Sequence, residues 1–158
     1  MSAATTLAQE SVGGNWFLYE SEDPMTAAKD VRLEIQADNF LRESSYRKPK
    51  IEIVCQNGDY KHATFIPGTK LGPPNRPGFW WQPQQEVLVR IDNKHHRKGW
   101  NWMRDRSLAM DKGTVRDLLK AKLFRVEFNS GRGPEIAEFT PDGLNRDRVY
   151  KACGSELK

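Results

Sequence analysis

Two segments carry the side chains most suited to chemistry or binding. The first is the stretch GPPNRPGFWWQPQ (residues 72–84), in which Phe79, Trp80 and Trp81 stand together near Arg76. Its four prolines fix backbone φ angles and remove amide donors, so the stretch is stiff and is neither a helix nor a central strand. Stiffness lowers the entropy cost of presenting side chains, and aromatic and arginine side chains dominate binding hot spots. We interpret this loop as a candidate contact surface for a protein partner.

A packing role for the same loop is an open alternative. A tryptophan ring can fold over the open edge of a sheet and cover it. Neighbouring side chains in an extended segment point to opposite sides. We therefore expect Trp80 and Trp81 to differ, with one ring packed inward and the other exposed.

The second segment, KHHRKGWNWM, interleaves basic and aromatic side chains. Its candidate binding residues are His95, His96, Arg97, Trp100 and Trp102. Such a mixture suits single-stranded nucleic acid, whose bases stack on rings and whose phosphates pair with cations. The same letters also suit a hairpin turn over residues 93–99 with solvated charges, followed by a strand that holds both tryptophans on one face. The turn is the interpretation we favour, and nucleic-acid binding is the alternative.

The sequence shows no motif for catalysis or for a metal. Neither G-x-S-x-G, H-E-x-x-H nor a Walker loop occurs. His95 and His96 would point apart on a strand, and His62 is distant, with no cysteine or carboxylate at metal-ligand spacing. We therefore expect a non-enzymatic protein with no catalytic residue, no metal and no cofactor.

Composition is that of a folded protein with a mild positive charge. The chain has 158 residues, with 25 Lys and Arg against 21 Asp and Glu. This excess permits anionic partners without requiring nucleic acid. No run approaches the roughly 18 apolar residues that span a bilayer, so we expect no membrane span. The start MSAATTLAQES lacks signal-peptide features. Residues 2–9 look like the residues that follow a cleavage site, which favours a periplasmic or secreted protein; a native start would make it cytoplasmic.

Two cysteines, Cys55 and Cys153, leave two alternatives open. A disulfide would close a loop of roughly 100 residues and contribute about 4–5 kcal/mol in the chain-entropy model. Two buried free thiols are the other reading.

Alternation of apolar and polar residues predicts the fold. The segments KDVRLEIQA, KIEIVCQ, EVLVRIDN and KLFRVEFNS each alternate with a period of two, which is typical of half-buried strands. Asn57-Gly58 predicts a tight hairpin after the second of these. We expect a mainly β, single-domain antiparallel β-sandwich of about seven to nine strands over residues 14–158, after a flexible tail of residues 1–13. Val31, Val89 and Val126 should meet in one interior.

Two short helices complete the expected domain. Thr114 can cap the first, which carries the apolar stripe Val115, Leu118 and Leu119. The second is expected to start at Thr140-Pro141, with proline at the first helical position.

The order of several features resembles a known group of proteins. These features are Trp16, Asp23-Pro24-Met25-Thr26, a strand ending at Cys55, Arg90-x-Asp92, Gly143-Leu144 and Cys153. The chain resembles small exported bacterial proteins associated with type VI secretion (TagO-type) and, more loosely, invasion-associated locus B proteins. The resemblance implies an envelope or secreted β-sandwich without known enzyme activity that acts through protein contacts. It is also consistent with a Cys55–Cys153 bridge.

The leading functional prediction is therefore a non-enzymatic exported binding or accessory domain that contacts a protein partner through the aromatic loop. A single-stranded nucleic-acid-binding protein is the first alternative. A structural subunit of an oligomer, in which Trp80 and Trp81 become buried, is the second.

Overall fold

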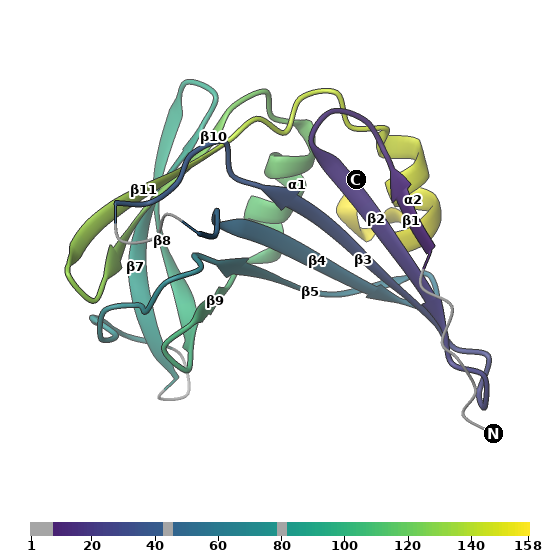
Figure 1. The fold of residues 1–158 in the computed structure, drawn as a ribbon, viewed down its shortest axis with the longest axis horizontal. Helices are drawn as coiled ribbons and strands as arrows, with labels where there is room; N and C mark the ends of the chain where they lie inside the picture. Colours follow the sequence, from purple (N-terminus) through teal and green to yellow (C-terminus); the bar gives the residue numbers. More distant parts are fainter. Residues whose placement is uncertain (1–7, 43–45, 79–81) are drawn as a thin grey trace.

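A computed structural model describes residues 8–42, 46–78 and 82–158 and shows a mainly antiparallel β protein with two short α-helices (Figure 1). The strands are β1 (Ala8–Ser11), β2 (Trp16–Glu22), β3 (Lys29–Gln36), β4 (Lys50–Gln56), β5 (Asp59–Ile66), β6 (Arg76–Pro77), β7 (Pro83–Ile91), β8 (Lys94–Met103), β9 (Ser107–Ala109), β10 (Phe124–Ser130) and β11 (Gly133–Phe139). The helices are α1 (Lys112–Lys120), α2 (Arg146–Cys153) and the short 3₁₀ helix η2 (Ser155–Leu157).

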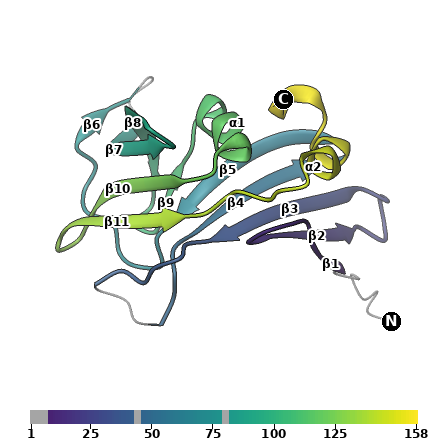
Figure 2. The same cartoon turned by 90° about the horizontal axis from the view of Figure 1, so that it is seen from above.

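All strands belong to one continuous sheet. Their order is β1-β2-β3-β4-β5-β9-β8-β7-β10-β11, and β6 pairs with β7 outside this path. In Figure 1 the strands β2–β5 form a broad blade, and β7 and β8 run steeply across one end of it. The two expected layers are thus parts of a single sheet, because β9 pairs with both β5 and β8 through Ala109. Figure 2 shows α1 and α2 on one side of the β2–β5 blade.

The core confirms the alternation seen in the sequence. Val31, Val89 and Val126 are all buried in one hydrophobic cluster. Near its centre the ring of Phe65 packs edge-on against Phe128, with centroids 5.1 Å apart. Side chains of both parts of the sheet therefore share one interior, as expected of a single domain.

The β4–β5 hairpin forms where the sequence predicts it. Asn57 and Gly58 have φ angles of 51° and 82°. Two successive residues with positive φ are required by the turn type that matches the strand twist. The Asn57 side chain also accepts a hydrogen bond from the amide of Lys29 at 3.0 Å, which ties this turn to the start of β3.

The predicted tail is wrong from Ala8 onward. Ala8–Ser11 pair with β2 as the edge strand β1. Val12 is buried, and its carbonyl accepts a hydrogen bond from the amide of Asn145. The folded domain therefore includes at least residues 8–13, and residues 1–7 lie outside the described part of the chain.

Both helices start at different residues from those predicted. Asp111, not Thr114, caps α1, and its carboxylate accepts hydrogen bonds from the backbone amide and the hydroxyl of Thr114 at 3.0 and 2.7 Å. The helix α2 begins at Arg146 after the cap Asn145 rather than at Pro141. The reason is tertiary, because the Pro141 carbonyl accepts a hydrogen bond from the indole of Trp16 at 2.8 Å.

The two cysteines form a disulfide, which decides between the two open alternatives. Cys55 in β4 and Cys153 at the end of α2 are both buried, with Cα atoms 5.3 Å apart. Structural disulfides persist in oxidising compartments. The bond therefore indicates an oxidising, extracytoplasmic environment. Within the described ranges, no helix is long and apolar enough to cross a bilayer.

Candidate functional site

The predicted turn over residues 93–99 is wrong, because the β7–β8 turn is much tighter. Asp92 and Asn93 alone connect the strands, and Asp92 has a φ of 51°. The Asp92 carboxylate accepts hydrogen bonds from the amides of Lys122 and Leu123 at 2.9 and 3.1 Å, which hold the turn against the chain before β10. The whole segment KHHRKGWNWM is therefore the strand β8.

Alternation along β8 divides the predicted binding residues between two faces. His96 pairs with Val89 and belongs to the face turned toward α1, where its side chain is exposed, whereas His95 and Arg97 pair with outward residues of β7. Trp100 is 0% exposed, and its indole donates to the Asp111 carboxylate at 3.0 Å. Trp100 is therefore part of the core and does not present its ring for base stacking.

Trp102 is also engaged within the fold. It is partly buried against the core, and its indole donates to the Gly72 carbonyl at 3.1 Å. The two tryptophans share a face of β8, as predicted, but both serve packing. The ring surface on which the nucleic-acid alternative depends is thus largely used inside the protein.

The electrostatics beneath β8 are set by Asp111. Partial burial of its carboxylate raises the pKa. Hydrogen bonds from Thr114 and Trp100 and the nearby charge of Lys98 lower the pKa more strongly, so the pKa lies below its ordinary value of 3.8. Asp111 thus caps α1 as an ion and joins that helix to β8.

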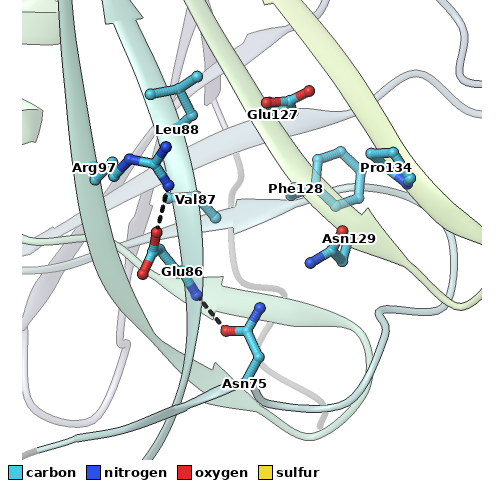
Figure 3. A pocket seen from close by; sticks show the side chains of 9 residues that line it. All are labelled: Asn75, Glu86, Val87, Leu88, Arg97, Glu127, Phe128, Asn129 and Pro134. Carbon is cyan, nitrogen blue, oxygen red and sulfur yellow. Dashed lines mark hydrogen bonds and ion pairs between the residues drawn. The ribbon is translucent and has the colours of Figure 1, made fainter.

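The outer face of β7, β8 and β10 contains a polar hollow of about 360 Å³. Figure 3 shows Arg97 and Glu86 meeting in an ion pair, with nitrogen and oxygen 2.9 Å apart. Asn75 lies beside them, and its side-chain oxygen accepts from the Glu86 amide at 2.8 Å. Glu127 and Asn129 of β10 line the opposite side. The hollow is therefore bordered by charged and amide groups from three strands and the segment before β6.

The hollow lies where the pairing of β7 with β10 stops. The last paired residues are Leu88 and Glu127. Beyond them, the fully buried side chain of Gln85 bridges the strands, donating to the Asn129 carbonyl at 3.0 Å and accepting from the Asn129 amide at 3.1 Å. One side-chain amide thus replaces a pair of backbone hydrogen bonds, and the strands separate around it.

The proline-rich segment is fastened at its base to the same face. Arg76 pairs with Gln84 as part of β6–β7, and the amide of Gly78 donates to the carbonyl of Gln82 at 2.9 Å. A Cβ atom on Gly99 would lie 3.0 Å from a guanidinium nitrogen of Arg76. Arg76 therefore lies directly over β8, and glycine at position 99 leaves room for it.

The structure brings together some of the predicted residues and separates others. Arg76 and Arg97 share the outer face, on either side of Glu86, whereas His96 lies exposed on the opposite face, at a hollow that Asp117 and Lys120 also line. His95 lies further along the outer face, opposite Arg90. Phe79, Trp80 and Trp81 lie outside the described residues, so the expected difference between the two rings stays a prediction.

Most of the lining of this hollow was not predicted from the sequence. None of Asn75, Glu86, Glu127 and Asn129 was expected to bind a partner. A turn placed at residues 92–93 would have aligned Glu86 and Arg97 on one face by simple alternation. The contribution of Asn129 had no such local signal, because it depends on the long-range contact with Gln85.

No metal cluster is found in the part of the chain that the structure describes: no three His, Cys, Asp or Glu side chains there are grouped to hold an ion. Comparison of the chain with protein-family models, curated proteins and solved structures gave no match. The resemblance to TagO-type and invasion-associated locus B proteins therefore stays a prediction.

Proposed function

We propose that the protein is a non-enzymatic binding domain of the periplasm or the cell exterior. It contacts a protein partner through the outer face around Arg76 and Arg97 and through the adjoining aromatic loop of residues 79–81. The observation that carries this proposal is the anchored base of the loop, in which Arg76 pairs with Gln84 and covers Gly99. A contact segment held on a rigid strand pair loses little entropy on binding.

Two further observations support this function. The Cys55–Cys153 disulfide suits a protein that works in an oxidising compartment. The hollow beside Arg97 offers both signs of charge and two amide side chains, which suit hydrogen bonding to a polar protein surface. An accessory role in secretion, which the resemblance implies, belongs to the same proposal.

Photo-cross-linking in the source organism tests this proposal. A benzophenone amino acid would replace Trp80 or Trp81, and the control would carry it at Met25, which is 89% exposed in the β2–β3 connection. We expect a covalent adduct of one discrete mass from the loop positions and none from position 25. Adducts that are equal at all three positions, or none at all, would refute the proposal. An adduct of twice the chain's mass would instead favour the oligomer subunit.

A further inference from the structure

A second hollow, which shares no lining residue with the first, lies at the end of β3, β4 and β5. Its volume is about 440 Å³. The register places Gln36, Lys50 and Ile66 side by side on three neighbouring strands, and all three line the hollow. The segment between β3 and β4 supplies the rest, through Phe40, Tyr46, Arg47 and Lys48, together with Gly68 after β5.

Two aromatic rings border this hollow and are left in solvent. Phe40 is 51% exposed and Tyr46 is 93% exposed. Aromatic side chains carry a large apolar surface that folding usually buries. Two such rings in the lining of one hollow therefore offer exposed apolar surface on which a flat ligand face can pack.

The charge at this hollow is positive. The Lys48 ammonium lies 5.2 Å from the centroid of the Phe40 ring. The Lys50 ammonium forms ion pairs with the carboxylates of Glu52 and Glu34, with nitrogen–oxygen distances of 2.9 and 3.9 Å. Its charge is therefore largely compensated. Among the described residues that line the hollow, none is acidic. Arg47 and Lys48 add two further cations to the lining, and the Lys48 ammonium stands beside an aromatic ring.

The position of Lys48 is fixed by the backbone around it. Gly68 has a φ of +77°, and a Cβ atom there would lie 3.3 Å from the Cβ of Arg47. The carbonyl of Pro49 accepts a hydrogen bond from the amide of Ala37 at 2.7 Å. The two chain segments that form the walls are thus held close together before any ligand binds.

We propose that this hollow binds an anionic sugar unit of a polysaccharide. The C–H face of the sugar ring packs on Tyr46 and Phe40, and its carboxylate or sulfate group pairs with Lys48. The amide of Gln36 is available to hydroxyl groups. The disulfide favours a sugar polymer over a nucleic acid, because it places the protein in an oxidising compartment, where acidic polysaccharides of envelopes and extracellular matrices are found.

Calorimetric titration of the full chain tests the proposal. The probes are a carboxylated oligogalacturonate, a sulfated heparin oligosaccharide, a neutral dextran oligosaccharide and a single-stranded oligodeoxynucleotide of equal charge. We expect one of the two acidic sugars to bind and the dextran not to bind. The acidic probe that binds identifies the anionic group. Failure of both acidic sugars, or tighter binding of the oligodeoxynucleotide, would overturn the inference.

Paired variants show whether binding occurs at this hollow. Tyr46→Ala and Lys48→Gln should each weaken binding of the acidic sugar about tenfold. Their controls are Phe17→Ala, which removes another partly exposed ring, and Lys94→Gln, which removes another exposed cation. Unchanged affinity in both test variants, or equal loss in the controls, would refute the site. Replacement of Trp81 should leave sugar binding intact, so this result is independent of the proposed protein contact.

Discussion

The two halves of the sheet are held together differently. In the half formed by β1–β5, the strands pair along nearly their whole length, with one irregularity between Val54 and Cys55, and a disulfide adds a covalent bond. The half formed by β7, β8, β10 and β11 is joined in part by side chains. The strands β2 and β3 pair from Trp16 to Glu22 without interruption, and the disulfide fastens β4 to α2. In the other half, the pairing of β7 with β10 stops at Leu88, and Gln85 takes its place.

The two edge strands of the sheet, β11 and β1, also differ in how far their backbone is covered. The edge of β11 is covered by Asn39, whose side-chain amide donates to the Ile136 carbonyl at 2.9 Å and accepts from the Glu138 amide at 2.8 Å. The edge of β1 is exposed along its four residues. A short edge strand is one way in which proteins discourage unwanted pairing.

This comparison shows two ways in which a binding surface can arise. Where backbone pairing is continuous, as at Lys50, the sheet stays closed and a hollow forms beside a connecting segment, here the one that carries Phe40. Where a side chain replaces the backbone, the strands separate and a hollow forms between them. The polar hollow beside Glu86 and Asn129 lies at such a point.

Removal of the covalent bond should have the largest effect. Replacing both Cys55 and Cys153 by alanine frees a loop whose ends are 98 residues apart. We expect a loss of about 4–5 kcal/mol in the free energy of unfolding. Urea denaturation would measure it, and reductant should destabilise only the wild type. Equal midpoints for the variant and the wild type would contradict a structural role of the bond.

Loss of the side-chain bridge should come next. Gln85→Leu leaves the amide of Asn129 without its acceptor and removes a donor to the Asn129 carbonyl, beside a fully buried position. We expect a loss of about 2–3 kcal/mol. Hydrogen exchange should accelerate at the Asn129 amide before it does in β2–β3. The matched control is Gln82→Leu, at an exposed position. An equally large loss of stability in that variant would contradict a stabilising role of the Gln85 bridge.

Uncovering the β11 edge should cost less. Asn39→Ala removes two hydrogen bonds to β11. Their loss should lower the free energy of unfolding by about 1–2 kcal/mol, measured by thermal denaturation. Asn39→Asp keeps the acceptor but loses the donor, so an intermediate loss is expected. Gln9→Ala on the exposed edge β1 should change stability by less than about 0.5 kcal/mol.

The smallest effect should come from the charge that links β8 to α1. The folded pKa of Asp111 is lowered, so its carboxylate stabilises the fold above the ordinary value of 3.8. This contribution is lost as the pH falls through the lowered folded pKa. Asp111→Asn keeps an N-cap oxygen, and its side chain is 40% exposed, so at neutral pH we expect a loss below about 1 kcal/mol. Urea titrations of both proteins between neutral and strongly acidic pH should show the difference in their free energies of unfolding disappearing. A difference that grows on acidification would contradict the lowered pKa of Asp111.

Local patterns were reliable where neighbouring residues decide the structure. Alternation identified the inward valines Val31, Val89 and Val126, and the pair Asn57-Gly58 identified its turn. The β7–β8 turn was predicted too far along the chain, because the polar residues that follow Asp92 resemble a loop. Its tight form depends on Lys122 and Leu123, whose amides are 30 and 31 residues away in sequence.

The candidate site was only partly accessible to such reasoning. Arg76 and Arg97 were named as binding residues, but their shared face follows from the packing of Arg76 over Gly99. Trp100 was named as well, and its burial depends on a core that strands from the whole chain build together.

The sequence by itself determined the core strands β3, β4, β7 and β10 and their inward side chains, because alternation is a property of successive residues in an extended chain. Only the tertiary structure decided that Cys55 meets Cys153, that Gln85 separates β7 from β10, and that Asn39 covers β11. These contacts join residues far apart in the chain. Their geometry depends on strand register and on packing of the shared core, which no local pattern specifies.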